Sequence, residues 1–215
     1  MLASDSMPRT IDHDARKADL AQAVWRVIAD RGLGAVSVRT VAAEAKVAVG
    51  SLRHLFPTRT ELIEFSAELM VERVTDRIQA LPRRADPREY ALDVLTELLP
   101  LTADGRAELE VNIALIAEAP AEPGLARIRD IADQALSRAC LHLVRLLRRE
   151  AGTEGADAGA DDTGADAADR ERALGTDALR LHALVDGLAL HLLVRDGSPE
   201  WALDILRAEV DRLAA

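Results

Sequence analysis

The sequence predicts an all-α protein of about nine helices, with a helix-turn-helix near its N-terminus. Its composition is dominated by Ala and Leu, and aromatic residues make up only 2% of the chain, which favours helix nearly throughout. Apolar residues recur three and four positions apart in most segments, which is the period of a helix with one buried face. Residues 37–64 hold two short helical patterns around a tight connection, followed by a further helix after Pro57. This arrangement is typical of a DNA-binding helix-turn-helix.

The first predicted helix runs from a cap at Thr10 or Asp12 to about Arg31. Residues 1–9, which precede it, are expected to form a disordered arm. The apolar positions of the first helix fall on one face, at Leu20, Val24, Val27 and Ile28. We therefore expect this face to pack in a core, together with Trp25.

The helix-turn-helix itself is predicted from local signals. Ser37 is a good N-cap for the second helix, and residues 46–47 connect it to the third helix, at about 48–55. Thr58 or Thr60 caps the fourth helix. A head of residues 1–62 is thus predicted as the DNA-binding domain.

Residues 63–215 are predicted to form a second helical domain. After the fourth helix, two helices are expected at about 87–99 and 103–118. A long helix is expected after Pro123, and two more at about 176–195 and 199–213. Residues 151–168 hold seven Ala, four Gly, five acidic residues and two Thr, with no large apolar side chain. Because such a segment cannot bury enough surface to order itself, we expect a flexible acidic loop there.

The charge distribution separates the head from the rest of the chain. The formal net charge is −10, but residues 1–60 carry nine Arg or Lys and six Asp or Glu, which leaves −13 for the remainder. A basic head on an acidic body can present a positive face to phosphate groups.

A cytoplasmic location is expected. Cys140 is the only cysteine, so no intrachain disulfide can form, which fits a reducing compartment; we expect this thiol to be a small buried apolar group. The N-terminus shows no apolar signal segment. The most apolar late segment, 181–194, is interrupted by His182, Asp186 and His191 and is too short and polar to span a membrane.

The third helix is expected to read DNA. Gly50 has no Cβ, so the backbone can approach DNA closely there, and Ser51 and Arg53 are donors on the exposed side. Leu52 and Phe56 lie four apart and are expected to anchor the helix in the head.

Residues 14–65 resemble the tetracycline-repressor (TetR) family of bacterial regulators. The resemblance rests on an Ala-rich first helix, Gly32, Val41-Ala42, Gly50-x-Leu52-x-x-x-Phe56 and a basic residue at position 59. It implies that double-stranded DNA is contacted by Ser37, Arg39, Thr40, Ala48, Val49, Gly50, Ser51, Arg53, His54 and Arg59.

The chain departs from this family at two positions. Arg53 stands where the family usually has Tyr, and it can donate to a phosphate with an added charge. Leu55 stands where His or Tyr is usual and cannot donate, so one phosphate contact is lost or moves to His54. Ala48 and Val49 offer only apolar contact, for example with thymine methyl groups.

Residues 181–189 resemble a helix of the family's betaine-regulator-like subgroup, which implies a domain that binds a ligand and forms a homodimer. The apolar stripe in this region is wider than about 100°, which favours burial on two sides. The dimer interface is predicted at Leu184, Leu188, Leu192, Leu206 and Val210. The alternative is that this stripe is the core of one chain.

A small-molecule pocket is predicted in the second domain, because polar groups that turn inward in a helical bundle can orient a ligand. Asn112, His142 and His182 are the candidates, and the alternative is that most of them are solvated. His182 and Asp186 lie one turn apart, but His191 is on the opposite side of the helix, so no metal site is expected. No cofactor is expected besides an unidentified small-molecule effector.

These observations favour a ligand-responsive repressor that binds a palindromic operator as a homodimer. A transcriptional activator or a ligand-independent DNA-binding protein of the same fold remains the alternative. An enzyme is disfavoured, because the sequence shows no Ser-His-Asp order, no phosphate-binding Gly-rich loop and no paired carboxylates with neighbouring bases.

Overall fold

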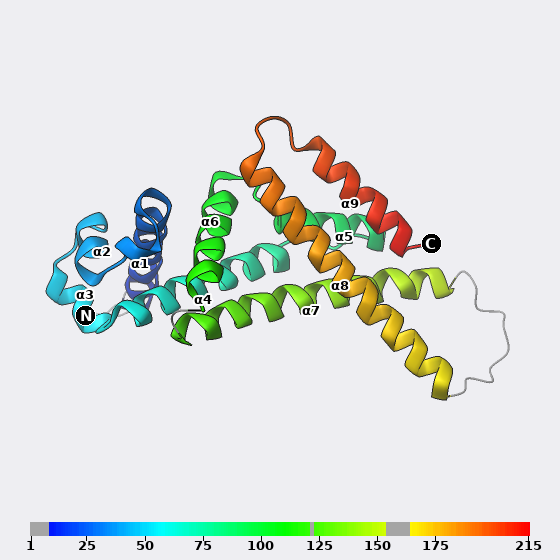
Figure 1. Cartoon of the computed structure of the whole chain (residues 1–215), viewed down its shortest axis with the longest axis horizontal. Coiled ribbons are helices and arrows are strands. Elements are labelled where there is room, and N and C mark those ends of the chain that lie inside the picture. Colours follow the sequence, from blue (N-terminus) through cyan, green and yellow to red (C-terminus); the bar gives the residue numbers. More distant parts are fainter. Residues whose placement is uncertain (1–8, 121–122, 154–163) are drawn as a thin grey trace, which may run out of the picture. The chain divides into compact units, whose positions relative to one another are not determined.

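The computed structural model describes residues 9–120, 123–153 and 164–215, and the secondary structure of this part is entirely helical. The predicted all-α fold class is confirmed (Figure 1). The elements in chain order are α1 (Arg9–Arg31), the 3₁₀ turn η1 (Leu33–Ala35), α2 (Val38–Glu44), α3 (Val49–Leu55), α4 (Arg59–Gln79), α5 (Pro87–Glu97), α6 (Ala103–Glu118), α7 (Pro123–Thr153), α8 (Gly164–Val194) and α9 (Glu200–Leu213).

The predicted flexible loop at residues 151–168 is partly wrong. α7 continues to Thr153 and α8 already begins at Gly164, twelve residues before the predicted start at 176. The prediction considered only buried area, but Ala is the strongest helix former and extends a helix without any apolar contact. Residues 154–163 lie outside the described part, as do residues 1–8 of the expected N-terminal arm.

The chain divides into two compact units. The N-terminal unit comprises Met1–Glu72 and Ala107–Arg129, and the C-terminal unit comprises Arg73–Arg106 and Asp130–Ala215. The helices α4, α6 and α7 therefore contribute residues to both units.

One apolar core holds the N-terminal unit together. The predicted inward face of α1 is confirmed, because Leu20, Val24, Val27 and Ile28 are at most 4% exposed. Trp25 is buried as expected, and its Nε1 donates to the carbonyl oxygen of Ser66 in α4 at 3.2 Å. The hydrogen bond satisfies the indole N–H inside the core and fixes α1 against α4.

The end of α6 and the start of α7 belong to this same core. The buried residues that they add are Val111, Leu115, Ala119, Leu125 and Ile128. Fully burying an aliphatic side chain of this size contributes about 1.5–3 kcal/mol. On the surface, Arg127 of α7 lies 3.4 Å from Glu68 and 3.7 Å from Glu64 of α4. The helix-turn-helix therefore shares its core with residues some sixty positions along the chain.

The C-terminal unit is built on contacts of α9 with α5 and α8. Arg106 of α6 donates to the carbonyl oxygens of Leu192 and Leu193, at 3.1 and 3.0 Å, and so satisfies two acceptors at the C-terminal end of α8. Asp177 of α8 accepts from Arg148 of α7 at 3.0 Å and from Arg212 of α9 at 2.8 Å. This carboxylate ties three helices together.

Candidate nucleic-acid interface

The turn between α2 and α3 is set by the backbone at Lys46. This residue has φ +56°, in the left-handed region. The amide of Val47 donates to the carbonyl oxygen of Ala42 at 2.9 Å, and the amide of Lys46 donates to the carbonyl oxygen of Ala43 at 3.2 Å. These bonds form a Schellman motif, which ends α2 and sets the direction of the chain into α3. Sequence reasoning missed this motif, because the position usually holds glycine.

α3 has one buried side and one exposed side. Leu52 and the following Phe56 are 1% and 7% exposed, which confirms them as anchors. The Phe56 ring packs against Phe65 of α4, with 4.9 Å between the ring centroids. The predicted DNA-contacting residues of this region are exposed: Ala48, Val49, Gly50, Ser51, Arg53 and His54. The helix is thus held from behind while these residues face outward.

Ser37 and Thr40 form a capping box at the start of α2. The Ser37 hydroxyl accepts from the amide of Thr40 at 3.1 Å, and the Thr40 hydroxyl accepts from the amide of Ser37 at 2.9 Å. The Thr40 hydroxyl also lies 2.8 Å from the carbonyl oxygen of Ala35, to which it donates. The polar atoms of both side chains therefore stabilise the helix start.

Arg59, at the start of α4, is directed toward the protein. Its Nε donates to the carbonyl oxygen of Val36 at 3.1 Å, and its Nη2 donates to that of Leu33 at 2.9 Å. The same Nη2 lies 3.4 Å from Glu118, the last residue of α6. Arg59 therefore connects η1, α4 and the end of α6; its contact with a phosphate stays a prediction.

The surface around α2 and α3 is depleted of negative charge. Glu44 is the only acidic residue between positions 32 and 60. Its carboxylate is 2.8 Å from Arg26 and 3.7 Å from Arg31 of α1, and the hydrogen bond from Arg26 holds its pKa below the usual value. The exposed cations Arg39 and Arg53 therefore lie in a region where a polyanion meets little repulsion.

The predicted pocket residues do not share one described cavity. His142 of α7 is exposed, and Asn112 of α6 is half-buried. His182 of α8 is largely buried, and its ring nitrogens lie 3.1 Å from the Ser137 hydroxyl and 3.4 Å from Asp186. Two cavities of the C-terminal unit, of about 610 and 420 Å³, are lined by other residues.

Cys140 is a buried apolar group, as expected. It lies in α7 and is fully buried. Burial, with a smaller contribution from the charge of Asp186, raises the pKa of its thiol to about 12. The thiol is therefore protonated and unreactive at neutral pH.

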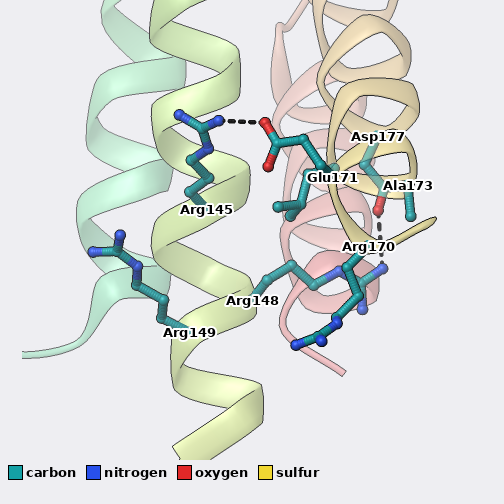
Figure 2. Close-up of a pocket in the computed structure, with 8 residues that line it drawn as sticks. Arg145, Arg148, Arg149, Arg170, Glu171, Ala173 and Asp177 are labelled. Atoms are coloured by element: carbon teal, nitrogen blue, oxygen red, sulfur yellow. Dashed lines mark hydrogen bonds and ion pairs between the residues drawn. The ribbon is translucent and has the colours of Figure 1, made fainter. Parts of the chain in front are cut away.

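The larger cavity, which we name the arginine cavity, lies between the end of α7 and the start of α8 (Figure 2). Its lining consists of Arg145, Arg148, Arg149, Arg170, Glu171, Ala173, Leu174 and Asp177. Arg145 donates to Glu171 at 2.6 Å, and Arg148 donates to Asp177 at 3.0 Å.

Most of the predicted dimer-interface residues pack inside one chain. Leu188, Leu192, Leu206 and Val210 are at most 9% exposed, and Leu184 is half-buried. The apolar stripe in the sequence does not distinguish the side of α8 that faces α9 from the side that faces outward. The large apolar residues that α8 and α9 expose are Leu179, Leu190, Val194 and Ile205.

None of the described helices is both long and apolar enough to cross a membrane.

Comparison with known proteins agrees with this architecture. Residues 20–64 match the family of bacterial regulatory proteins named tetR, and residues 87–215 match the C-terminal domain of BetI-type transcriptional repressors. The chain is 34% identical over 208 residues to the HTH-type transcriptional regulator PksA of Bacillus subtilis strain 168, covering 96% of this chain and 88% of that protein.

Solved structures share the fold. A transcriptional regulator from Rhodococcus sp. Rha1 aligns with a TM-score of 0.71 and 26% identity, over 92% of this chain and 95% of that one. A regulator from Saccharomonospora viridis in complex with choline aligns with a TM-score of 0.67 and 23% identity, over 93% of this chain and 95% of that one.

Proposed function

The chain belongs to the TetR family of bacterial transcriptional regulators, and from this premise we propose that it is a repressor that a small molecule releases from DNA. The family consists of DNA-binding regulators and not of enzymes. Repression of a palindromic operator by a homodimer in the cytoplasm is the form of regulation that we propose for this chain.

The observation that carries the proposal is the exposed side of α3. Its anchors Leu52 and Phe56 are buried, whereas Gly50, Ser51 and Arg53 face outward. In a helix-turn-helix this second helix lies in the major groove, where side chains reach phosphates and base edges. Two copies of α3 would occupy half-sites about 34–36 Å apart, which requires a two-fold symmetric protein and a palindromic site.

The exposed apolar side chains of α8 and α9 support a homodimer. Leu190 and Val194 of α8 are 49% and 69% exposed, and Ile205 of α9 is 42% exposed. Leu190 and Val194 lie one turn apart on the same face of α8, and exposed apolar residues gathered on one face are typical of an interaction site. We propose that a second copy covers these residues through a symmetric contact.

Release by a ligand is supported by the way α6 is connected. α6 begins in the C-terminal unit at Ala103 and ends in the N-terminal unit at Glu118, beside Arg59. Arg59 in turn donates to the carbonyl groups of Leu33 in η1 and of Val36 just after it, which precede the helix-turn-helix. A ligand that shifts α6 would act on α2 and α3 through this contact. The choline bound to the S. viridis regulator is consistent with a small-molecule effector for this chain.

The experiment is a thermal-shift screen of the protein against small molecules, followed by operator titration with each stabilising compound. Ligand and DNA must weaken each other by the same factor, so a stabilising effector should raise the operator Kd. A compound that stabilises the protein and lowers the operator Kd would contradict release by that ligand. A screen without any stabilising compound would favour a ligand-independent DNA-binding protein.

A further inference from the structure

Gly124, the second residue of α7, lies against the first turn of α4 inside the N-terminal unit. A Cβ atom placed on Gly124 would lie 2.7 Å from the Cγ2 methyl of Thr60 and 3.4 Å from Oε1 of Glu64. Carbon atoms in contact are normally about 3.5–4.0 Å apart. The two helix starts are therefore closer than a side chain at position 124 allows unless a neighbour moves.

The local backbone gives no reason for a glycine at this position. Among the described glycines, Gly32 and Gly197 are those with a positive φ, so Gly124 has a backbone conformation that other residues adopt. Within a helix, glycine is less favourable than alanine. The close approach to Thr60 is therefore the feature that an alanine at position 124 would disturb.

Neither helix start can move away freely. Leu62 and Ile63 of α4 and Leu125 of α7 are fully buried in the core of the N-terminal unit. A shift of the start of α7 would disturb these packed side chains, and close-packed interiors resist such shifts. Thr60 is β-branched, which restricts the rotation of its methyl group about χ1. We therefore expect an added Cβ at Gly124 to displace the first turn of α4 by roughly 1 Å.

The first turn of α4 also contains Arg59, which directly precedes Thr60. Arg59 donates to the carbonyl oxygens of Leu33 and Val36 at 2.9 and 3.1 Å, and these two residues precede α2. A displaced first turn would strain both hydrogen bonds, which hold the segment that leads into α2 and α3. The close approach at Gly124 is thus linked to the helix-turn-helix through Arg59.

We propose that Gly124 is a positioning residue for the helix-turn-helix. Its missing side chain lets the start of α7 pack against Thr60, and this spacing sets the position of Arg59 and, through Arg59, of α2 and α3. The effect of Gly124 on operator affinity rests on the proposed function, whereas its effect on the DNA-free protein does not.

The variant that tests the proposal is Gly124→Ala, and the double variant Gly124→Ala with Thr60→Ser is its rescue. Serine keeps the hydroxyl of Thr60 and removes the methyl group that the new Cβ would meet. The matched control is Gly175→Ala in α8, where an added Cβ would meet no atom within 4 Å. Thr60→Ser alone should behave as wild type.

The first measurement is hydrogen exchange of the DNA-free full chain, followed by mass spectrometry. We expect Gly124→Ala to speed the exchange of residues 33–56 at least about tenfold, while α5 and α9 keep their wild-type rates. The double variant should restore the wild-type rates, and Gly175→Ala should not alter the exchange of residues 33–56.

The second measurement is the Kd for the upstream DNA fragment that the wild type binds most tightly, taken well below the melting temperature of each variant. A loss of stability alone does not change the Kd of a fully folded protein. We expect Gly124→Ala to raise this Kd at least about tenfold and the double variant to recover it.

Four results would overturn the proposal. They are wild-type exchange of residues 33–56 in Gly124→Ala, equally accelerated exchange throughout that variant, an unchanged Kd on a fragment that the wild type binds selectively, and a double variant that recovers neither exchange nor affinity. A wild type that binds no fragment selectively would refute the proposed operator binding instead, and the exchange rates would still decide the role of Gly124.

Discussion

At the scale of single residues, the predicted DNA-contacting side chains differ in what their polar atoms contact. The polar atoms of Ser37, Thr40 and Arg59 are hydrogen-bonded within the protein, to the start of α2 and to carbonyl groups of η1. Arg39 and Arg53 are exposed on α2 and α3. We therefore expect the first group to position the interface and the second to contact DNA.

Replacing Arg53 should weaken DNA binding without regard to sequence. We expect Arg53→Ala to cost about 1–2 kcal/mol on every DNA fragment, because a charge-assisted contact to a phosphate is lost. The slope of log Kd against log salt concentration should fall by about one. Fluorescence anisotropy at several salt concentrations measures both, with Arg138→Ala as the control. A loss confined to one operator base pair would show that Arg53 reads a base.

Replacing Arg59 should affect folding as well as DNA binding. Arg59→Ala leaves the carbonyl oxygens of Leu33 and Val36 without this donor, so we expect unfolding to become easier by about 1–3 kcal/mol. Urea denaturation followed by circular dichroism measures this, with Arg53→Ala as the control that keeps wild-type stability. An Arg59→Ala protein as stable as wild type would contradict the positioning role.

Asp177 makes stability depend on pH. Burial alone would raise its pKa, but the hydrogen bonds from Arg148 and Arg212 outweigh burial and hold the pKa below its ordinary value. A carboxyl whose folded pKa is lowered stabilises the fold above its unfolded pKa, near 3.8, and the stabilisation is lost as pH falls below that value.

Asp177→Asn should therefore lower the free energy of unfolding by about 1–3 kcal/mol at neutral pH. The difference from wild type should shrink below about pH 4. Urea titrations at a series of pH values measure both effects, and Asp169→Asn, which removes an exposed carboxylate of α8, is the control. A difference that stays constant to acid pH would mean that Asp177 acts through packing rather than charge.

At the scale of elements, the turn between α2 and α3 carries strain that can be removed. Lys46 adopts φ +56°, which is unfavourable for any residue with a Cβ and free of cost for glycine. We expect Lys46→Gly to stabilise the fold by about 1 kcal/mol. Thermal denaturation measures it, with Lys46→Ala as the control, which removes the charge but keeps the strain. An unchanged or lower melting temperature for Lys46→Gly would contradict this account.

Local patterns predicted the helices of the DNA-binding unit well. The period of α1, the Ser37 cap and the Thr58 cap of α4, which accepts from the amide of Glu61 at 3.1 Å, are all encoded within a few residues. The connection at residues 46–47 was predicted, but the left-handed backbone of Lys46 was missed because no glycine marks it. The packing of the end of α6 into the same core, and the contact of Glu118 with Arg59, join segments that are distant in sequence, where local patterns carry no information.

The C-terminal end of α7 and the start of α8 were missed for a different reason. Both helices extend into the Ala-rich segment, to Thr153 and from Gly164, as the high helix propensity of Ala favours. The same limit applies to the dimer surface. Apolar spacing identified α8 and α9 as buried helices, but only the packing of one chain separates Leu188, which is in the core, from Leu190, which is exposed.

At the scale of the whole molecule, we expect DNA affinity to depend on two copies binding together. Leu190→Glu would place two like charges in the proposed symmetric interface, so we expect dissociation into monomers and weaker operator binding. Sedimentation velocity and operator titration measure these effects. Ile116→Glu is the matched control, because Ile116 of α6 is also 49% exposed. A Leu190→Glu protein that stays dimeric would place the interface elsewhere.

The central claim is that this chain recognises a specific operator through α3. The most direct measurement is a fluorescence anisotropy titration of the protein onto DNA fragments from the region upstream of its own coding sequence, at two salt concentrations. The account predicts that one palindromic fragment binds at least about 10³-fold more tightly than bulk DNA. Uniform weak binding to these fragments and to random genomic fragments would contradict it.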